Sequence, residues 1–135
     1  MKCEIKKLDE LKWSPHPFLK GVEFKYLLTK AEDNVDITFC FVKVEPGTDV
    51  EAHVHEAQDD IIYMVSGSVK MWVEKEGDFE VKAGQMIKIP KGVKHKPYDH
   101  SPDFLCMEIF LPAMVWIRGQ RNCEITDGHD ISANR

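Results

Sequence analysis

The sequence predicts an all-β fold, and three observations lead to this class. Apolar and polar residues alternate in short runs, which is the period of a half-buried strand and not that of an amphipathic helix. Glycine, proline, Asn and Asp residues separate these runs, as tight turns require. The runs follow one another at close spacing. We therefore expect many antiparallel strands arranged in a sandwich or barrel.

The alternating runs contain Val, Ile, Phe, Tyr or Trp, the residue types that strands favour. The expected strands are 22–28, 35–44, 60–65, 68–73, 78–81, 86–89 and 104–111. The sequence Glu76-Gly77-Asp78 joins two of these runs. It predicts a hairpin in which Gly77 adopts a positive φ.

A chain of 135 residues has the size of one compact domain, so we expect a single domain over 1–135 with its barrel core at about 22–111. The first 20 residues indicate an irregular arm that lays aromatic groups such as Trp13 and Phe18 across the outside of the barrel. Residues 112–135 are expected to form a C-terminal extension, of which 117–135 contain only scattered apolar residues. We expect the domain itself, a second subunit or a crystal neighbour to hold it.

Charge and composition exclude some partners. The formal net charge of -5 argues against nucleic acid, which requires clustered Lys and Arg. The N-terminus lacks the apolar core of a secretory signal, and Pro112 interrupts the longest apolar stretch, so we expect a soluble cytoplasmic protein without a membrane partner. The cysteines form no CxxC pair, which favours reduced thiols. Lys91, Lys94 and Lys96 indicate a solvated loop face, with steering of an anionic substrate as the alternative.

Two segments carry the pattern of a metal site. The first contains, in order, Gly47, His53, His55, Asp60 and Gly67. The second contains Gly84, Pro90, Gly92 and His95. Residues two apart in a strand share a face, so His53 and His55 can aim both imidazoles at one point. If the fold brings His95 to the same point, the three imidazoles form an open site for a divalent transition metal.

These segments resemble the two signature motifs of the cupin superfamily. The first follows the pattern Gly-x5-His-x-His, then an acidic position after three or four residues, then x6-Gly. The second follows Gly-x5-Pro-x-Gly-x2-His at every fixed position. Motif matching covers about 46–99, and the strand pattern extends the resemblance over nearly all of the chain. The resemblance implies a double-stranded β-helix, or jelly-roll cupin barrel, of the small single-domain kind, with a metal held by His53, His55 and His95.

The acidic position departs from the family pattern. Asp60 stands where the family usually has Glu, and its side chain is one methylene shorter. Asp59 also lies at an allowed spacing after His55, but successive strand residues point to opposite faces, so at most one of the two turns inward. We favour Asp60 as the fourth metal ligand. Asp99 replaces a frequent Asn of the family and is expected either to accept a hydrogen bond near the site or to cap a turn.

Two further residues are candidates for catalysis in the pocket. Glu108 lies within an apolar strand sequence, where burial of a carboxylate is costly unless a partner or metal offsets it. If its strand faces the pocket, Glu108 is a candidate general base. Tyr98 is the second candidate. His16, His100 and His129 lack a spacing argument and are interpreted as surface residues, with His100 retained as a candidate for the pocket rim.

Two functions from different classes stay open. In the first, the protein is a metalloenzyme whose metal keeps positions open for a small substrate, water or dioxygen. Fe would suit dioxygenase chemistry, whereas Zn, Mn or Ni would suit isomerase, lyase or hydrolytic chemistry. In the second, it is a non-catalytic cupin that binds or senses a small molecule, and its metal is structural or absent. The resemblance also implies a homodimer.

Overall fold

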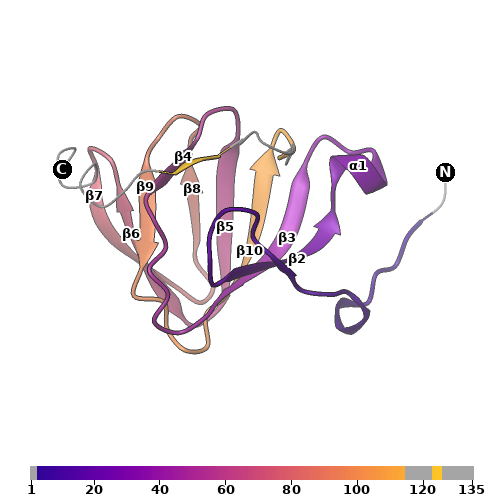
Figure 1. Ribbon diagram of the computed structural model, residues 1–135, viewed down its shortest axis with the longest axis horizontal. Helices are drawn as coiled ribbons and strands as arrows, with labels where there is room; N and C mark the ends of the chain where they lie inside the picture. The colour runs from indigo at the N-terminus through magenta and orange to yellow at the C-terminus, as the bar shows by residue number, and fades with distance from the viewer. Residues whose placement is uncertain (1–2, 115–122, 126–135) are drawn as a thin grey trace.

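Two antiparallel sheets face one another and enclose the core (Figure 1). The computed structural model describes residues 3–114 and, for the backbone alone, residues 123–125. Strand is the dominant secondary structure of these residues. The helical segments among them are a 3-10 turn, Leu8–Glu10, and the four-residue helix α1, Lys30–Asp33. The all-β class expected from the alternation is confirmed, and the arrangement is that of a jelly roll.

The six-stranded sheet forms one layer of this sandwich. In spatial order it contains β1 (Ser14–Pro15), β2 (Val22–Leu28), β3 (Thr38–Val44), β10 (Leu105–Leu111), β5 (Asp59–Ser66) and β8 (Met86–Ile89). Burial alternates along its strands: Cys40 and Val42 on β3, and Ile62 and Met64 on β5, are buried, while their strand neighbours are more exposed. Every second side chain therefore enters the core.

The five-stranded sheet forms the second layer. In spatial order it contains β11 (Cys123–Ile125), β4 (His53–His55), β9 (His95–Tyr98), β6 (Ser68–Val73) and β7 (Gly77–Lys82). Val69, Met71 and Val73 on β6 join the core cluster of the other sheet. The hairpin expected between β6 and β7 is present, with Gly77 at φ 101° and in register with Val73.

The expected strand limits agree closely with the observed ones for β2, β6 and β8. The strand predicted over 35–44 begins later, at Thr38. Its first part follows α1, where Thr29 accepts a hydrogen bond from the backbone N–H of Glu32 at the start and Asn34 ends the turn at φ 54°. Residues 35–37, which alternation assigned to the strand, therefore lie in the irregular chain between α1 and β3.

The N-terminal arm divides its side chains between the outside and the core. The ammonium groups of Lys25 and Lys43 lie 5.1 and 4.4 Å from the centroid of the Trp13 ring. This cation–π contact places Trp13 on the outer face of β2 and β3, as predicted for the arm. Leu19, by contrast, is buried in the core cluster. The arm thus supplies part of the barrel interior.

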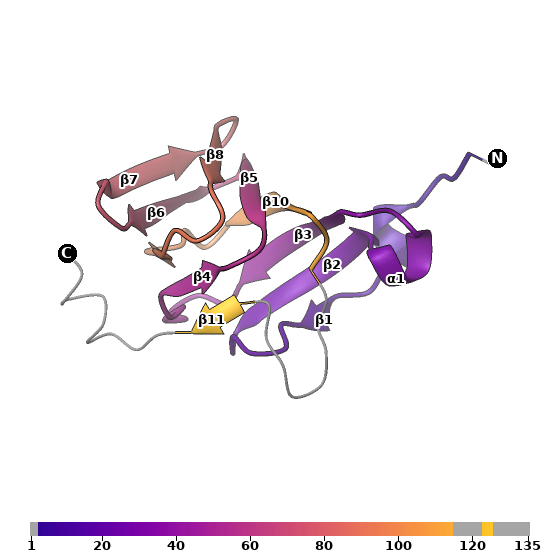
Figure 2. The same ribbon diagram turned by 90° about the horizontal axis from the view of Figure 1, so that it is seen from above.

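The predicted C-terminal extension, 112–135, lies for the most part outside the described residues. Its described parts are residues 112–114 and β11; β11 pairs with β4 in antiparallel register, and Figure 2 shows the two strands side by side. The domain itself therefore holds this piece of the extension. Within residues 3–114 and 123–125, no helix has the length and apolar character needed to span a membrane.

Candidate metal centre

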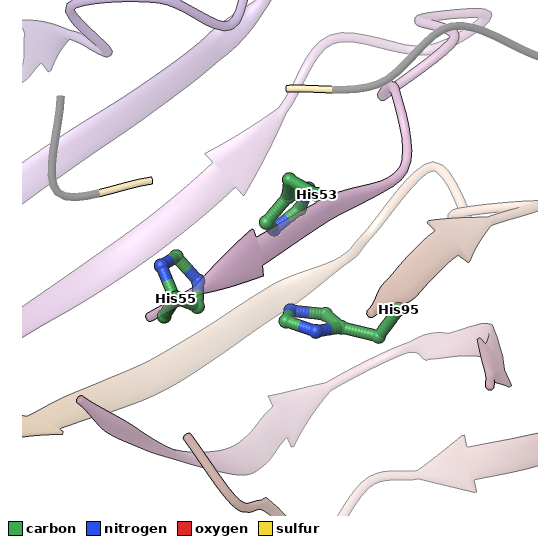
Figure 3. A group of neighbouring side chains, drawn as sticks. All are labelled: His53, His55 and His95. Atoms are coloured by element: carbon green, nitrogen blue, oxygen red, sulfur yellow. The ribbon is translucent and has the colours of Figure 1, made fainter. Parts of the chain in front are cut away.

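Three histidines converge inside the sandwich. His53 on β4 and His95 on β9 are register partners, and His55 lies two residues further on the same face of β4. One ring nitrogen of each histidine lies within 4.8 Å of the corresponding nitrogens of the other two. Figure 3 shows the three rings turned toward a common space from two neighbouring strands. All three residues are buried.

Backbone carbonyls orient two of these rings. Nδ1 of His53 lies 2.8 Å from the carbonyl oxygen of Glu51, and Nδ1 of His95 lies 3.0 Å from that of Val93. In this arrangement Nδ1–H donates to the carbonyl, so Nε2 keeps its lone pair for a ligand. Burial, and then the neighbouring His95 and His55, hold the pKa of His53 well below its usual range. The ring is therefore neutral, as metal binding requires.

Asp60 lies beside the three imidazoles. Its Oδ2 is 3.5 Å from Nε2 of His55 and 3.6 Å from Nε2 of His95, and the residue is 1% exposed. Both carboxylate oxygens and Nε2 of His95 are buried without a hydrogen-bond partner in the described part of the chain. Such groups are costly unless something else satisfies them. Two ligands that bind one ion at about 2.1 Å lie roughly 3.0–3.5 Å apart, so the donor set fits a divalent metal.

Strand alternation separates the two neighbouring aspartates. Asp60 faces inward from β5 between its register partners Ile89 and Phe110. Asp59 turns the other way, and its Oδ1 accepts a hydrogen bond of 3.0 Å from the backbone N–H of Lys91. Asp59 thus fixes the turn that leads toward His95, while Asp60 reaches the histidines.

Glu108 also faces the interior, from β10, and lines the same cavity as the histidines and Asp60. Burial and then the charge of Asp60 raise the pKa of Glu108 well above its usual range. Although burial by itself raises the pKa of Asp60, the side chains of His55, His95 and Glu108 bring it below its usual range. The two neighbouring acids therefore differ in acidity: Glu108 holds a proton more tightly than a free glutamate, and Asp60 loses one more readily than a free aspartate.

The structure does not bring Tyr98 to this site. Its hydroxyl donates a hydrogen bond of 2.8 Å to Oδ1 of Asp78, and its ring packs against Ala52 and Trp72. The physical reason is strand alternation on β9: His95 and Pro97 line the cavity, so Tyr98, an odd number of residues from His95, lies on the opposite face.

A cavity of about 60 Å³ adjoins the histidines. Since this volume counts only positions open to the centre of a water molecule, it leaves room for a small molecule beside an ion. Most of its lining is aliphatic or aromatic, and His100 belongs to it, in line with its retention as a rim candidate. The polar part of the lining contains the three convergent histidines, Asp60 and Glu108.

His16 is a cavity residue that the sequence reasoning missed. It was expected at the surface, but it is 8% exposed and lines the cavity. Its Nδ1 accepts hydrogen bonds of 3.0 Å from the backbone N–H groups of both Phe18 and Leu19. Burial, and then the nearby His55, lower the pKa of His16 to about 4. Flanking prolines at 15 and 17 are the local signal of this fixed loop; His129 lies outside the described residues.

Comparisons with known proteins agree with this architecture. The family profile described as a cupin domain matches residues 40–107, just over half of the chain and a span that includes both histidine segments. The chain therefore belongs to the cupin superfamily. Comparison with curated proteins gave no match.

Solved structures share the fold. A predicted oxalate decarboxylase from Thermotoga maritima has 22% identity and a TM-score of 0.70, covering 81% of this chain and 99% of that one. KdgF from Halomonas sp. has 24% identity and a TM-score of 0.64, covering 77% and 90%. Bacillus subtilis oxalate decarboxylase, described with Mn(II) centres, has 21% identity and a TM-score of 0.64, covering 76% and 29%. At these identities the likeness concerns the fold.

Proposed function

We propose that this cupin binds one divalent transition metal through His53, His55, His95 and Asp60 and acts on a small molecule as a metalloenzyme. The observation that carries the proposal is the convergence of three imidazole nitrogens within 4.8 Å, next to a buried carboxylate without a hydrogen-bond partner in the described chain. A structural neighbour with Mn(II) centres gives further support. Fe, Zn, Mn and Ni all suit a site rich in histidine.

The side chains around the site suit proton transfer at a substrate. A bound divalent metal would supply Lewis-acid polarisation or, for iron, dioxygen chemistry. Burial and the charge of Asp60 raise the pKa of Glu108, which favours its protonated form, so it is the candidate to donate a proton to a substrate oxygen and later take one back. The apolar part of the cavity excludes water from this exchange. Isomerase-like and lyase-like chemistry can use such an acid, whereas dioxygenase-like chemistry would depend on the metal.

Metal analysis of the purified protein tests the proposal. We expect about one equivalent of metal in the wild type and its loss in His95→Ala. The matched control is His100→Ala, which removes a cavity imidazole that is not among the three converging histidines and should keep the metal. Oxygen uptake with small diketones and thiols then separates dioxygenase chemistry from the other reactions. A metal-free wild type, or metal retained by His95→Ala, would contradict the proposal.

The alternative function is that of a cupin that binds or senses a small molecule without turnover. The mostly apolar lining of the cavity is the observation that favours it, because burial against such a wall can hold a small molecule without any reaction. The two functions differ in the fate of a bound molecule. Ligand that is recovered unchanged after prolonged incubation with the metal-loaded protein would identify a binder, whereas a new product would identify an enzyme.

We also propose that the protein forms a homodimer through the outer face of the six-stranded sheet. Across four strands of this face the register neighbours are Phe41, Met107, Tyr63 and Met86, with Phe39, Ile109 and Ile61 in the next row. Tyr63 is 40% and Met86 59% exposed in the single chain. An exposed apolar face of this extent favours association with a second copy.

Light scattering after size exclusion tests the dimer. Met107→Lys places a charge at the centre of the outer face and should shift the protein from dimer to monomer. The matched control, Glu80→Lys, adds a positive charge to β7 of the other sheet, at an exposed position, and should leave the dimer intact. A monomeric wild type would refute the proposal.

A further inference from the structure

Within the described part of the chain, the cavity beside the histidines is lined by acidic side chains but by no lysine or arginine. Asp60 and Glu108 are the two carboxyl groups in its lining, and no lysine or arginine among residues 3–114 contributes to it. The remaining polar lining consists of imidazoles and the Cys106 thiol. The described walls therefore provide no fixed cation with which an anionic ligand could pair.

Lys96, the lysine next to His95 on β9, points away from the cavity. Lys96 alternates with His95 and Pro97 on β9 and lies on the outer face of the sheet. Its ammonium group donates hydrogen bonds of 2.8 Å to Oδ1 of Asp49 and 2.7 Å to the carbonyl oxygen of Val50. The ammonium group is thus held by partners outside the cavity, and only its longer-range charge acts on His100 of the lining.

Two imidazoles of the lining, His16 and His100, are neutral near pH 7. Burial, with the nearby His55, lowers the pKa of His16 to about 4. For His100, burial lowers the pKa to about 4; Asp99 opposes this shift and the charge of Lys96 adds to it. Neither ring therefore provides a positive charge that could pair with an anionic group of a ligand.

The rest of the wall is apolar and comes from several strands. Val22 and Phe24 on β2, Val42 and Val44 on β3, and Met71 on β6 all line the cavity. An ionised group placed against such side chains loses its hydration without a compensating hydrogen bond or ion pair. The wall therefore favours the uncharged part of a ligand.

From these observations we infer that the cavity selects small molecules that are uncharged or carry a single negative charge, with one or two oxygen donors at the histidine end and an apolar body against β2, β3 and β6. The inference rests on the proposed metal site. A divalent ion with one Asp60 carboxylate and three neutral imidazoles leaves one net positive charge, which a monoanion balances. A dianion such as a dicarboxylate or a phosphate ester leaves an unpaired charge in an apolar wall.

A matched pair of 2-oxo acids tests the inference. 2-Oxopentanoate and 2-oxoglutarate share the chelating group and the length of five carbons, but the first ends in a methyl group and the second in a carboxylate. Calorimetric titration of the Mn(II)-loaded full chain should show at least about tenfold tighter binding of 2-oxopentanoate. The reason is that burial of an unpaired carboxylate costs more free energy than a tenfold change in affinity represents. Equal or tighter binding of 2-oxoglutarate would overturn the inference.

A charge introduced into the wall should reverse this preference. Val44 is only partly buried and lines the cavity, so Val44→Lys can hold an ammonium group near the ligand. We expect 2-oxoglutarate to bind Val44→Lys about tenfold more tightly than the uncharged control Val44→Met, since a pair of charges interacts strongly at low dielectric. If both variants bind it alike, the wall does not decide the selectivity.

Failure of the proposed metal site is distinguishable from failure of the inference. If the protein retains no metal, the proposed function fails, and the selectivity is then read from the metal-free chain by ligand-observed NMR. There pentan-2-one should bind and 2-oxoglutarate should not, because the Asp60 carboxylate repels anions. Binding of 2-oxoglutarate in preference to the ketone would overturn the inference.

Discussion

His53 and His95 are register partners across β4 and β9, and their ring centroids lie 4.5 Å apart. Both strands are short, so few backbone hydrogen bonds join the two halves of the site. A metal that bridges their imidazoles would add a cross-link at this point. Metal binding and local stability are therefore expected to depend on one another.

The first prediction concerns the response of stability to metal. Addition of Mn(II) or Ni(II) at 100 times its dissociation constant should stabilise the fold by about 2.7 kcal/mol, as for a ligand that binds only the native state. Hydrogen exchange should slow most at β4 and β9. A chelator should reverse the shift without unfolding the protein, because the apolar core cluster does not include the histidines. Unfolding by the chelator would contradict this expectation.

The second prediction compares the two adjacent aspartates. Asp60→Asn keeps the shape of the side chain but removes the charge beside His55 and His95, and should weaken metal binding about 10–100-fold. Asp59→Asn is the matched control, since Asp59 faces outward and accepts a hydrogen bond from Lys91. Metal affinity of the control should change little. Equal losses in both variants would show that Asp60 has no special part in the site.

The third prediction concerns Glu108, whose pKa is raised by burial and by Asp60. The folded protein holds this proton to higher pH than the unfolded chain does, so stability is lost as the pH rises above the usual range of a glutamate. Glu108→Gln stays neutral and escapes this loss. The melting temperature of the metal-free variant should exceed that of the metal-free wild type by a few degrees at pH 8 and equal it near pH 4. A stability difference of 1 kcal/mol corresponds to about 4 °C for a domain of this size. Turnover should fall at least about 100-fold if Glu108 carries the proton.

Much of the fold was predictable because alternation is a local property. The strands β2, β6 and β8 follow from apolar residues at every second position, and the hairpin at Gly77 follows from a turn residue between two such runs. The same rule separates Asp60 from Asp59 on β5. Applied from His95 along β9, it also places Tyr98 on the outer face, although Tyr98 was selected for the pocket without this step.

Other features depend on contacts between distant segments. Nothing in the period of the sequence places His16 in the cavity, because its position comes from the path of the N-terminal arm across the end of the barrel and from its hydrogen bonds to Phe18 and Leu19. The convergence of β4 with β9 likewise required the spacing of the two motif segments, since each strand is too short to be identified by alternation. Tertiary packing decides these positions.

The fourth prediction follows from the pKa of His16, which lies at about 4 in the folded protein against an ordinary value of 6.5. As the pH falls, the unfolded chain binds this proton first, so stability is lost between about pH 6.5 and 4. His16→Asn places an amide oxygen near the position of Nδ1 and cannot titrate. Its melting temperature should fall less steeply than that of the wild type across this interval. Parallel curves would show that the His16 ring does not contribute.

The last prediction concerns two motif glycines that share a positive φ but differ in surroundings. Gly67 has φ 75°, and a methyl group on it would overlap Oγ of Ser101 and lie 2.7 Å from Oδ1 of Asp103. Ser101 links this turn to the chain that precedes β10, because its Oγ accepts a hydrogen bond from the backbone N–H of Ser68 and donates one to Asp103. Gly84 has φ 86° with no atom within 4 Å of the added methyl group.

Gly84→Ala should therefore cost only the backbone strain, about 1 kcal/mol, whereas Gly67→Ala adds a steric clash and should cost about 2–4 kcal/mol. Urea denaturation of both variants measures the difference. Because Gly67 ends β5, the strand that carries Asp60, its variant should also bind metal less tightly than Gly84→Ala. Equal destabilisation would mean that Ser101 and Asp103 move aside, and that positive φ alone accounts for glycine at this position.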